Sequence, residues 1–231
     1  MDEVQLPSSE AKLPKKIGTL TNSISTLLIG TLKSICTFAN YFSYLCTSLL
    51  LPIMDKITLL DKTFVKYISE KEIEEATERI AQQINEDYKN DQPVLLVTLN
   101  GAIVFAVELM KKLTMPCKIS CVKLSSYSGT SSTNQVKELV GLNEDLTGKR
   151  VIIIEDIVDT GLTYEHMHKM LMDAHAKDVR MATMAFKPDA YTKELPVHYV
   201  ALPIPNKFVV GHGLDYDGWG RNLTDIYQLS D

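Results

Sequence analysis

The chain has 231 residues, of which 45% are hydrophobic and 23% are charged, and its 24 basic and 29 acidic side chains give a net charge of −5. These proportions are those of an ordinary globular chain, which excludes a wholly disordered, collagen-like or disulfide-stapled protein. An acidic chain without a long basic run is also a poor candidate for binding a nucleic-acid backbone. Any basic site must therefore be local.

Residues 1–53 differ in composition from the rest of the chain. They carry a net charge of +1, and the stretch from Ser34 to Ile53 holds no charged residue. This stretch has about the length of a membrane-spanning helix, but Ser, Thr, Asn and Tyr dilute it. Three interpretations stay open: a membrane anchor, a targeting leader, or sequence upstream of the true start. We expect one domain over 54–231, with membrane contact only if the extension is part of the working protein.

Helix and strand patterns alternate after residue 54. Ser69 and Glu72 have the spacing of a capping box, which predicts a helix that starts there and ends near Asn90. The next predicted elements are a strand over 93–100, a helix over 102–113 and a strand over 118–124. Cys117 and Cys121 share one face of that last strand, and we interpret them as small buried side chains rather than zinc ligands.

A polar segment then interrupts the pattern. Residues 125–134 are small, polar and rich in turn formers, which predicts a mobile loop that is either dispensable or a lid over a site. Beyond it we predict strands over 150–157 and 179–187, a helix over 163–176, and strand-like runs over 198–205 and 208–215. Strand–helix alternation of this kind is typical of a mostly parallel α/β sheet flanked by helices.

The segment from Val151 to Thr163 holds the strongest chemical pattern. Four consecutive β-branched residues predict a central strand, and Glu155, Asp156 and Asp159 follow it before the turn enters a helix. Open α/β sheets bind ligands at the carboxyl ends of their strands, where glycine and the free amides of a helix N-terminus form a phosphate cradle. Adjacent carboxylates suit a ligand that also carries ribose hydroxyls and a divalent cation. A simple capped strand–helix junction is the plainer alternative, but it does not account for the paired acids.

This segment resembles the signature with which type I phosphoribosyltransferases bind phosphoribosyl pyrophosphate. Further matches to the hypoxanthine–guanine branch of that family occur in the family's order, at Leu99–Gly101, Ser126–Tyr127, Lys187, Lys207–Tyr216 and Arg221–Leu223. The resemblance runs from about residue 59 to the C-terminus. It implies the type I phosphoribosyltransferase fold: a central, mostly parallel sheet flanked by helices, with a small hood built from the terminal segments.

The resemblance also implies a reaction. A phosphoribosyl group would pass to N9 of hypoxanthine or guanine, giving IMP or GMP and pyrophosphate, with xanthine left open as a substrate. In the family pattern Asp159 accepts a proton near N7, Lys187 donates to O6, Phe208 stacks on the purine, and the Val209 backbone reads its Watson–Crick edge. Electrostatic stabilisation of the departing pyrophosphate should dominate catalysis, and Mg²⁺ is the implied cofactor.

The remaining implied roles concern the sugar, the phosphates and the metal. Glu155 and Asp156 would hold the ribose hydroxyls and the metal, Asp215 would support the metal, and Arg221 would contact pyrophosphate. The cradle of the 5′-phosphate would comprise Asp159, Thr160, Gly161, Leu162 and Thr163, with Ser126 and Tyr127 in the flexible loop and Asn100 and Gly101 at the pyrophosphate. Asn100 stands where many family members have a basic residue, so one charged contact to pyrophosphate is missing.

Several interpretations compete with this one. A regulator that keeps the fold and binds nucleic acid predicts a basic surface, whereas residues 54–231 carry a net charge of −6. A transferase for another base is disfavoured by Lys187 and by the 208–215 segment. The expected partners are thus phosphoribosyl pyrophosphate and a 6-oxopurine base, without nucleic acid. We expect a cytoplasmic homodimer or homotetramer.

Overall fold

A computed structural model describes residues 56–126, 136–140 and 145–230. The N-terminal extension, and with it the three interpretations of that segment, lies outside the described residues. Within the described residues, no helix has both the length and the apolar character needed to cross a membrane.

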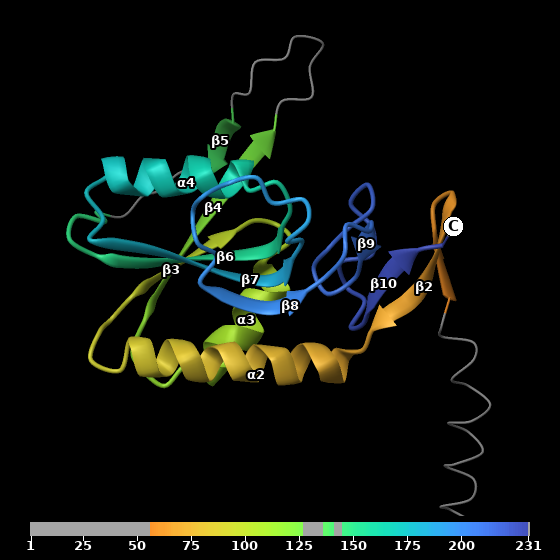
Figure 1. Cartoon of the computed structure of the whole chain (residues 1–231), viewed down its shortest axis with the longest axis horizontal. Helices are drawn as coiled ribbons and strands as arrows, with labels where there is room; N and C mark the ends of the chain where they lie inside the picture. The colour runs from red at the N-terminus through yellow and green to blue at the C-terminus, as the bar shows by residue number, and fades with distance from the viewer. Residues whose placement is uncertain (1–55, 127–135, 141–144, 231) are drawn as a thin grey trace, which may run out of the picture. The chain divides into compact units, whose positions relative to one another are not determined.

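A six-stranded sheet forms the centre of the fold (Figure 1). Its strands lie in the order β5-β4-β3-β6-β7-β8, and all neighbours are parallel except β4 and β5. The strands are β3 (Val94–Thr98), β4 (Lys118–Ser126), β5 (Val136–Val140), β6 (Arg150–Val158), β7 (Asp178–Phe186) and β8 (Tyr199–Pro203). The predicted parallel α/β sheet is confirmed, and its central strand, β6, is the one that leads into the predicted phosphate turn.

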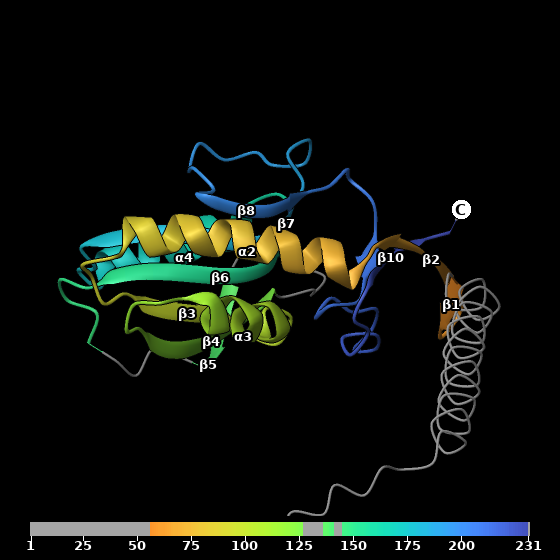
Figure 2. The ribbon, with the colours of Figure 1, turned by 90° about the horizontal axis from the view of Figure 1, so that it is seen from below.

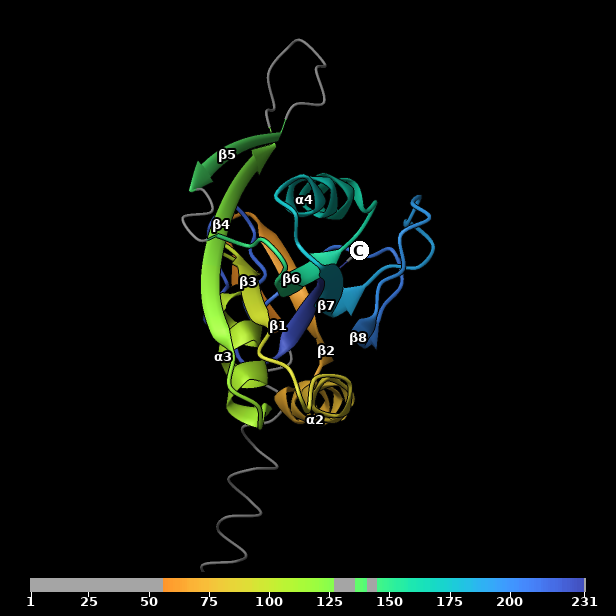
Figure 3. The same ribbon diagram turned by 90° about the vertical axis from the view of Figure 1, so that its left-hand side faces the viewer.

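Helices cover both faces of this sheet, as Figure 3 shows end on. The helices are α2 (Glu70–Asp87), α3 (Ile103–Lys112) and α4 (Leu162–Asp173). Alternate residues of β6 enter two cores: Ile152 and Ile154 pack with α2 and α3, whereas Val151 and Ile153 pack with α4. A strand buried on both faces needs apolar residues at every position, which explains the unbroken apolar run in the sequence.

A smaller antiparallel sheet stands beside one end of the large one (Figures 1 and 2). Its strands lie in the order β1-β2-β10-β9, so it joins the start of the described chain to its C-terminal segment. The strands are β1 (Lys56–Leu59), β2 (Lys62–Ile68), β9 (Val209–Val210) and β10 (Ile226–Leu229). This sheet is the predicted hood, and Ile68 and Val209 anchor it in the same core as Ala102.

The predicted starts of the helices are confirmed, while the predicted ends of α2 and α4 need small corrections. Ser69 and Glu72 form the expected capping box, in which each residue's side chain accepts a hydrogen bond from the other's backbone N–H. α2 ends at Asp87 rather than near Asn90. α4 ends at Asp173, because His175 adopts a left-handed backbone conformation and closes the helix.

Two other predicted segments differ more from the observed structure. The polar loop was expected to begin at residue 125, but Ser125 and Ser126 continue β4 and pair with β5, so that start is wrong. Residues 127–135, and thus Tyr127, lie outside the described part. The strand-like run 208–215 keeps only two residues in a strand, because Gly211, His212 and Gly213 all have positive φ angles that a strand does not accommodate.

Candidate active site

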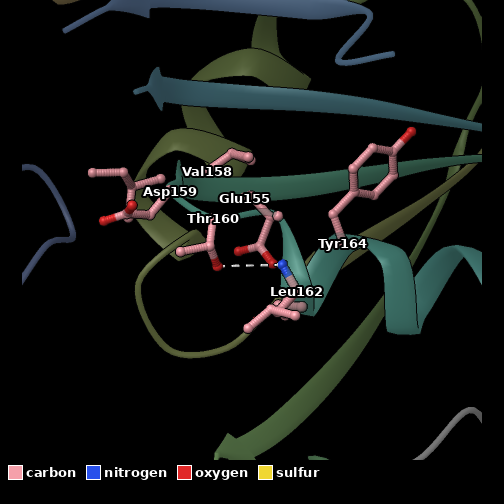
Figure 4. Close-up of a pocket in the computed structure, with 9 residues that line it drawn as sticks. Glu155, Val158, Asp159, Thr160, Leu162 and Tyr164 are labelled. Atoms are coloured by element: carbon pink, nitrogen blue, oxygen red, sulfur yellow. Dashed lines mark hydrogen bonds between the residues drawn. The ribbon is translucent and has the colours of Figure 1, made fainter. Parts of the chain in front are cut away.

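The predicted phosphate turn connects β6 to α4 and lines a pocket (Figure 4). Gly161 is the N-cap of α4, with a φ of 84°, and has no side chain to cap the helix, while the Leu162 N–H donates to the Thr160 hydroxyl oxygen at 3.5 Å. The helix N-terminus therefore offers backbone amides and the positive end of the helix dipole to an anion. The lining residues are Glu155, Ile157, Val158, Asp159, Thr160, Gly161, Leu162, Thr163 and Tyr164.

The loop after β7 holds this turn in place. The Thr192 backbone N–H and hydroxyl both donate to the Thr160 carbonyl, at 3.3 and 3.1 Å. A Cβ atom on Gly161 would overlap the Tyr191 ring and would lie 2.8 Å from Cγ of Lys193. Only glycine fits, both for its φ and for this contact. Sequence reasoning missed this supporting loop, and no motif in the sequence marks it.

Glu155, which is buried, and Asp156, which is half-buried, are neighbours near the end of β6. Glu155 is only 6% exposed, and burial, followed by repulsion from Asp156, raises its pKa well above the usual range, while the Thr98 hydroxyl opposes that shift. Burial likewise raises the pKa of Asp156 to about 6, against the Ile157 N–H and the positive charge of Arg221. A cation or a set of hydroxyl donors would relieve the cost of burying both carboxylates.

The chain brings the predicted pyrophosphate residues together around two glycines. A Cβ on Gly101 would overlap the Asp156 carboxylate and lie 3.2 Å from Nη1 of Arg221. A Cβ on Gly213 would in turn overlap the Gly101 carbonyl. Nη1 of Arg221 donates to the Gly213 carbonyl at 2.7 Å, and Nη2 lies 2.6 Å from Oδ1 of Asp215. Gly101 and the 213–221 segment, although far apart in the sequence, thus meet beside Asp156.

Asn100 lies next to this cluster. The Leu99–Asn100 peptide bond is cis, and the Asn100 side chain is exposed. The Leu99 N–H donates to the Val122 carbonyl, which ties this loop to β4. The position therefore offers main-chain groups, and an uncharged side chain, to the space beside Gly101.

Lys187 and Asp159 form an ion pair at the carboxyl ends of neighbouring strands. Nζ of Lys187 lies 2.9 Å from Oδ2 of Asp159. The Lys187 side chain is 10% exposed and the Asp159 side chain 46% exposed, so the pair opens to solvent on the carboxylate side. The Lys187 N–H also donates to the Val158 carbonyl at 3.0 Å. A donor and an acceptor are thereby fixed side by side next to the phosphate turn.

The hood supplies the predicted aromatic platform. Phe208 is 45% exposed, and its ring meets Tyr216 edge to face with centroids 5.9 Å apart. Nζ of Lys62, on β2, lies 4.7 Å from the Tyr216 ring centroid and 6.0 Å from that of Phe208. Val209 begins β9, the last strand of the small sheet. Its backbone therefore lies at a sheet edge, where main-chain groups are accessible to a ligand.

The acidic residues of the site are of the type that binds magnesium, although few of them lie together. The described residues hold no group of three or more His, Cys, Asp or Glu side chains arranged for a metal. Mg²⁺ needs only one or two carboxylates, because it keeps water and substrate phosphates as its other ligands. Glu155 and Asp156 meet that requirement. Both oxygens of Asp215 are engaged, by Arg221 and by the Gly218 N–H.

Known proteins share both this sequence pattern and this fold. The family model described as "Phosphoribosyl transferase domain" matches residues 66–217. A hypoxanthine-guanine phosphoribosyltransferase of Streptococcus pyogenes is 36% identical over 164 residues, which are 71% of this chain and 91% of that protein. That of Streptococcus thermophilus is 36% identical over 175 residues, 75% and 97% of the two chains.

The solved structures agree. A crystal structure of a hypoxanthine-guanine phosphoribosyltransferase from Bacillus anthracis superposes with a TM-score of 0.68 at 32% identity, covering 71% of this chain and 98% of that one. The chain therefore belongs to the phosphoribosyltransferase family. The similar proteins named above come from its hypoxanthine-guanine branch.

Proposed function

We propose that this protein transfers the phosphoribosyl group of phosphoribosyl pyrophosphate to N9 of hypoxanthine or guanine, forming IMP or GMP. The Lys187–Asp159 pair carries the proposal. N7 and O6 lie on one edge of a 6-oxopurine. Lys187 donates to O6, while Asp159 accepts from N7–H. Adenine presents an amino group in place of O6, which turns a hydrogen bond into an encounter between two donors.

The chemistry follows from these positions. The bond from C1′ to the pyrophosphate oxygen breaks, the bond from C1′ to N9 forms, and the proton on N7 passes to the Asp159 carboxylate. The amides of the 160–163 turn hold the 5′-phosphate. Arg221 and the main chain of Asn100 and Gly101 hold the leaving pyrophosphate. Developing charge is thus met by groups that are already oriented.

Other residues contact the purine base and complete the proposed substrate site. Phe208 stacks on one face of the purine, and the Val209 backbone, at the edge of the small sheet, reads the Watson–Crick edge. Ser126 is the last residue of β4, and we propose that it and Tyr127, which follows it in the sequence, contact the substrate. Xanthine differs from hypoxanthine at C2, away from Lys187, so this pair does not discriminate between them.

Magnesium completes the proposed site. Glu155 and Asp156 would hold it and would accept hydrogen bonds from the ribose hydroxyls, and Asp215 would support it from the pyrophosphate side once its carboxylate exchanges a present contact with Arg221 or the Gly218 N–H. When bound, Mg²⁺ neutralises the pyrophosphate as it leaves. The Glu155–Asp156 pair supports this assignment, because desolvation raises the pKa of both adjacent carboxylates and a cation beside them would offset that cost.

An assay of pyrophosphate release with five bases tests the proposal. We expect Mg²⁺-dependent pyrophosphate release with hypoxanthine and guanine and none above background with adenine or uracil. The result with xanthine shows whether it is also a substrate. The alternative, a regulator with this fold that binds nucleic acid, predicts no release with any base. Absence of release with both hypoxanthine and guanine would refute the proposed transferase activity.

The variant Asp159→Asn tests the proton acceptor. It keeps the shape of the side chain but removes the base, so we expect kcat to fall roughly 10²- to 10⁴-fold, the usual contribution of a positioned base. The Kd for phosphoribosyl pyrophosphate, measured by calorimetry, should stay within about threefold, because the phosphate contacts of this turn come from its backbone, which the substitution leaves in place. A normal kcat would remove Asp159 from the mechanism.

Location and assembly are also proposed. Cys117 and Cys121 are free, as is usual in the reducing cytoplasm, where we place the protein. A homodimer or homotetramer is favoured by the exposed apolar side chains of Ile103 and Val107 on α3 and Ile119 on β4, which are 50%, 41% and 47% exposed. Sedimentation equilibrium distinguishes these assemblies from a monomer.

A further inference from the structure

A buried histidine lies inside the hood and contacts the large domain. His212 is 2% exposed and has a φ of 49°, a left-handed conformation that histidine tolerates better than most residues. Its Nδ1 lies 3.3 Å from the Thr224 carbonyl oxygen. Its Nε2 is 3.1 Å from Oε2 of Glu108, at ion-pair distance although without the alignment of a hydrogen bond. The ring therefore faces an acceptor at each nitrogen, and Glu108 comes from a different element, α3.

The contact joins two segments that build the pyrophosphate side of the site. α3 begins directly after Asn100 and Gly101. Its residue Val104 lies 3.7 Å from the position that a Cβ on Gly213 would occupy, and Glu108 follows one helical turn later on the same side. One face of α3 thus packs along the loop that contains His212, and the Glu108–His212 contact is a polar contact within that packing.

The residues next to His212 hold the arginine. The Gly213 carbonyl accepts the hydrogen bond from Nη1 of Arg221, and the Gly213 N–H donates to the Arg221 carbonyl at 3.0 Å. Asp215, two residues further on, pairs with Nη2 of the same guanidinium. A displacement of this loop relative to α3 would therefore move Arg221 and Asp215 relative to Gly101.

We propose that His212 and Glu108 are positioning residues, which set Arg221 and Asp215 against the Asn100–Gly101 loop and so form the pyrophosphate half of the substrate site. The inference rests on the proposed function, because it assigns Arg221 to pyrophosphate. It goes beyond that function in naming a pair outside the catalytic groups. The base half of the site is held by other contacts: Lys187 pairs with Asp159, and Phe208 accepts from the Leu229 N–H and packs on Tyr216.

Two single variants and their combination test the pair in the full chain. His212→Asn keeps a residue that tolerates a left-handed backbone, but its side chain is too short to reach Glu108. Glu108→Ala removes the carboxylate and keeps a strong helix former. We expect either variant to raise KM for phosphoribosyl pyrophosphate, and for pyrophosphate in the reverse reaction, roughly fivefold, the factor that corresponds to about 1 kcal/mol. KM for hypoxanthine and kcat should stay within about twofold.

The double variant and a control complete the design. If the two side chains act through each other, the double variant should show the KM of a single variant rather than the product of both effects. Glu78→Ala, which removes from α2 an exposed partner of Lys112, should leave kcat and all three KM values unchanged.

A purely structural pair gives a different result. It would lower the melting temperature while shifting the KM values of base and phosphoribosyl pyrophosphate together or not at all, and that result overturns the positioning role. If His212→Asn fails to fold, Glu108→Ala decides alone, because Glu108 is partly exposed on a helix. A parent enzyme that neither binds phosphoribosyl pyrophosphate nor releases pyrophosphate would instead refute the proposed function and, with it, this inference.

Discussion

Lys187 and Asp159 lie side by side because of strand register. Val158 and Phe186, the last residues of β6 and β7, are paired in the parallel ladder, so the residues that follow them emerge next to each other. A lysine at the end of a strand is ordinarily a solvated surface residue, yet Lys187 is 8% exposed. Two residues that are far apart in the sequence thus become one donor–acceptor unit at the edge of the sheet.

Removal of the Lys187 ammonium should impair the use of 6-oxopurines. A hydrogen bond to a charged group contributes about 1.5–3 kcal/mol, so Lys187→Ala is expected to lower kcat/KM for hypoxanthine and guanine roughly 10- to 100-fold. Steady-state kinetics measures this change. The matched control is Lys149→Ala, at an exposed position, which should leave kcat/KM unchanged. Equal efficiency in Lys187→Ala and the parent would contradict the role given to Lys187 at O6.

At the scale of elements, the strand–turn–helix unit of β6 and α4 depends on one glycine. Gly161→Ala places a methyl group against the Tyr191 ring and also strains a φ of 84°. The variant should lose stability and raise KM for phosphoribosyl pyrophosphate by about tenfold or more, because the amides of the turn shift away from the 5′-phosphate.

Gly148 provides the matched control for this variant. It also has a positive φ, 68°, but a Cβ there would meet nothing within 4 Å. Gly148→Ala should therefore cost only the backbone strain, about 1–2 kcal/mol in thermal or denaturant unfolding, with an unchanged KM. The difference between the two variants isolates the contact with Tyr191. If both variants raise KM alike, that contact has no part in shaping the turn.

Elements with a local signal could be predicted from the sequence. The capping box at Ser69 and the apolar run of β6 follow from spacing within a few residues, and the paired acids of the turn lie within the same short segment. Of the hood strands, the sequence predicts only β9, as part of the longer run 208–215. β10 has four residues and pairs with β2, which lies far away in the sequence, so no local periodic pattern marks it.

The candidate site divides in the same way. Its residue types come from motifs, but its packing comes from contacts between distant segments. The close approach of Gly213 to Gly101, and of Tyr191 to Gly161, depends on how the hood and the 187–195 loop fold back. Such non-local contacts leave no signature in a single sequence, apart from the glycines that permit them.

At the scale of the whole molecule, the described fold and its site residues are contained within 56–230. β1 starts at Lys56 and pairs with β2, which in turn pairs with β10, so all four described strands of the hood lie within 56–230. The composition change at residue 53 coincides with this start. The extension and the catalytic domain are therefore separable in our proposal, whichever of the three interpretations of the extension holds.

A chain that starts at Met54 tests this separation. It should unfold within about 2 °C of the full chain and keep kcat/KM within about twofold, since a change in stability of 1 kcal/mol would already shift the melting temperature by about 2–4 °C. A chain that starts at Ser69 is the contrasting control. It lacks β1 and β2, removes the fully buried Phe64, and leaves β10 without its main partner, so it should lose both stability and activity. Loss of activity in the Met54 chain would show instead that residues 1–53 belong to the working enzyme.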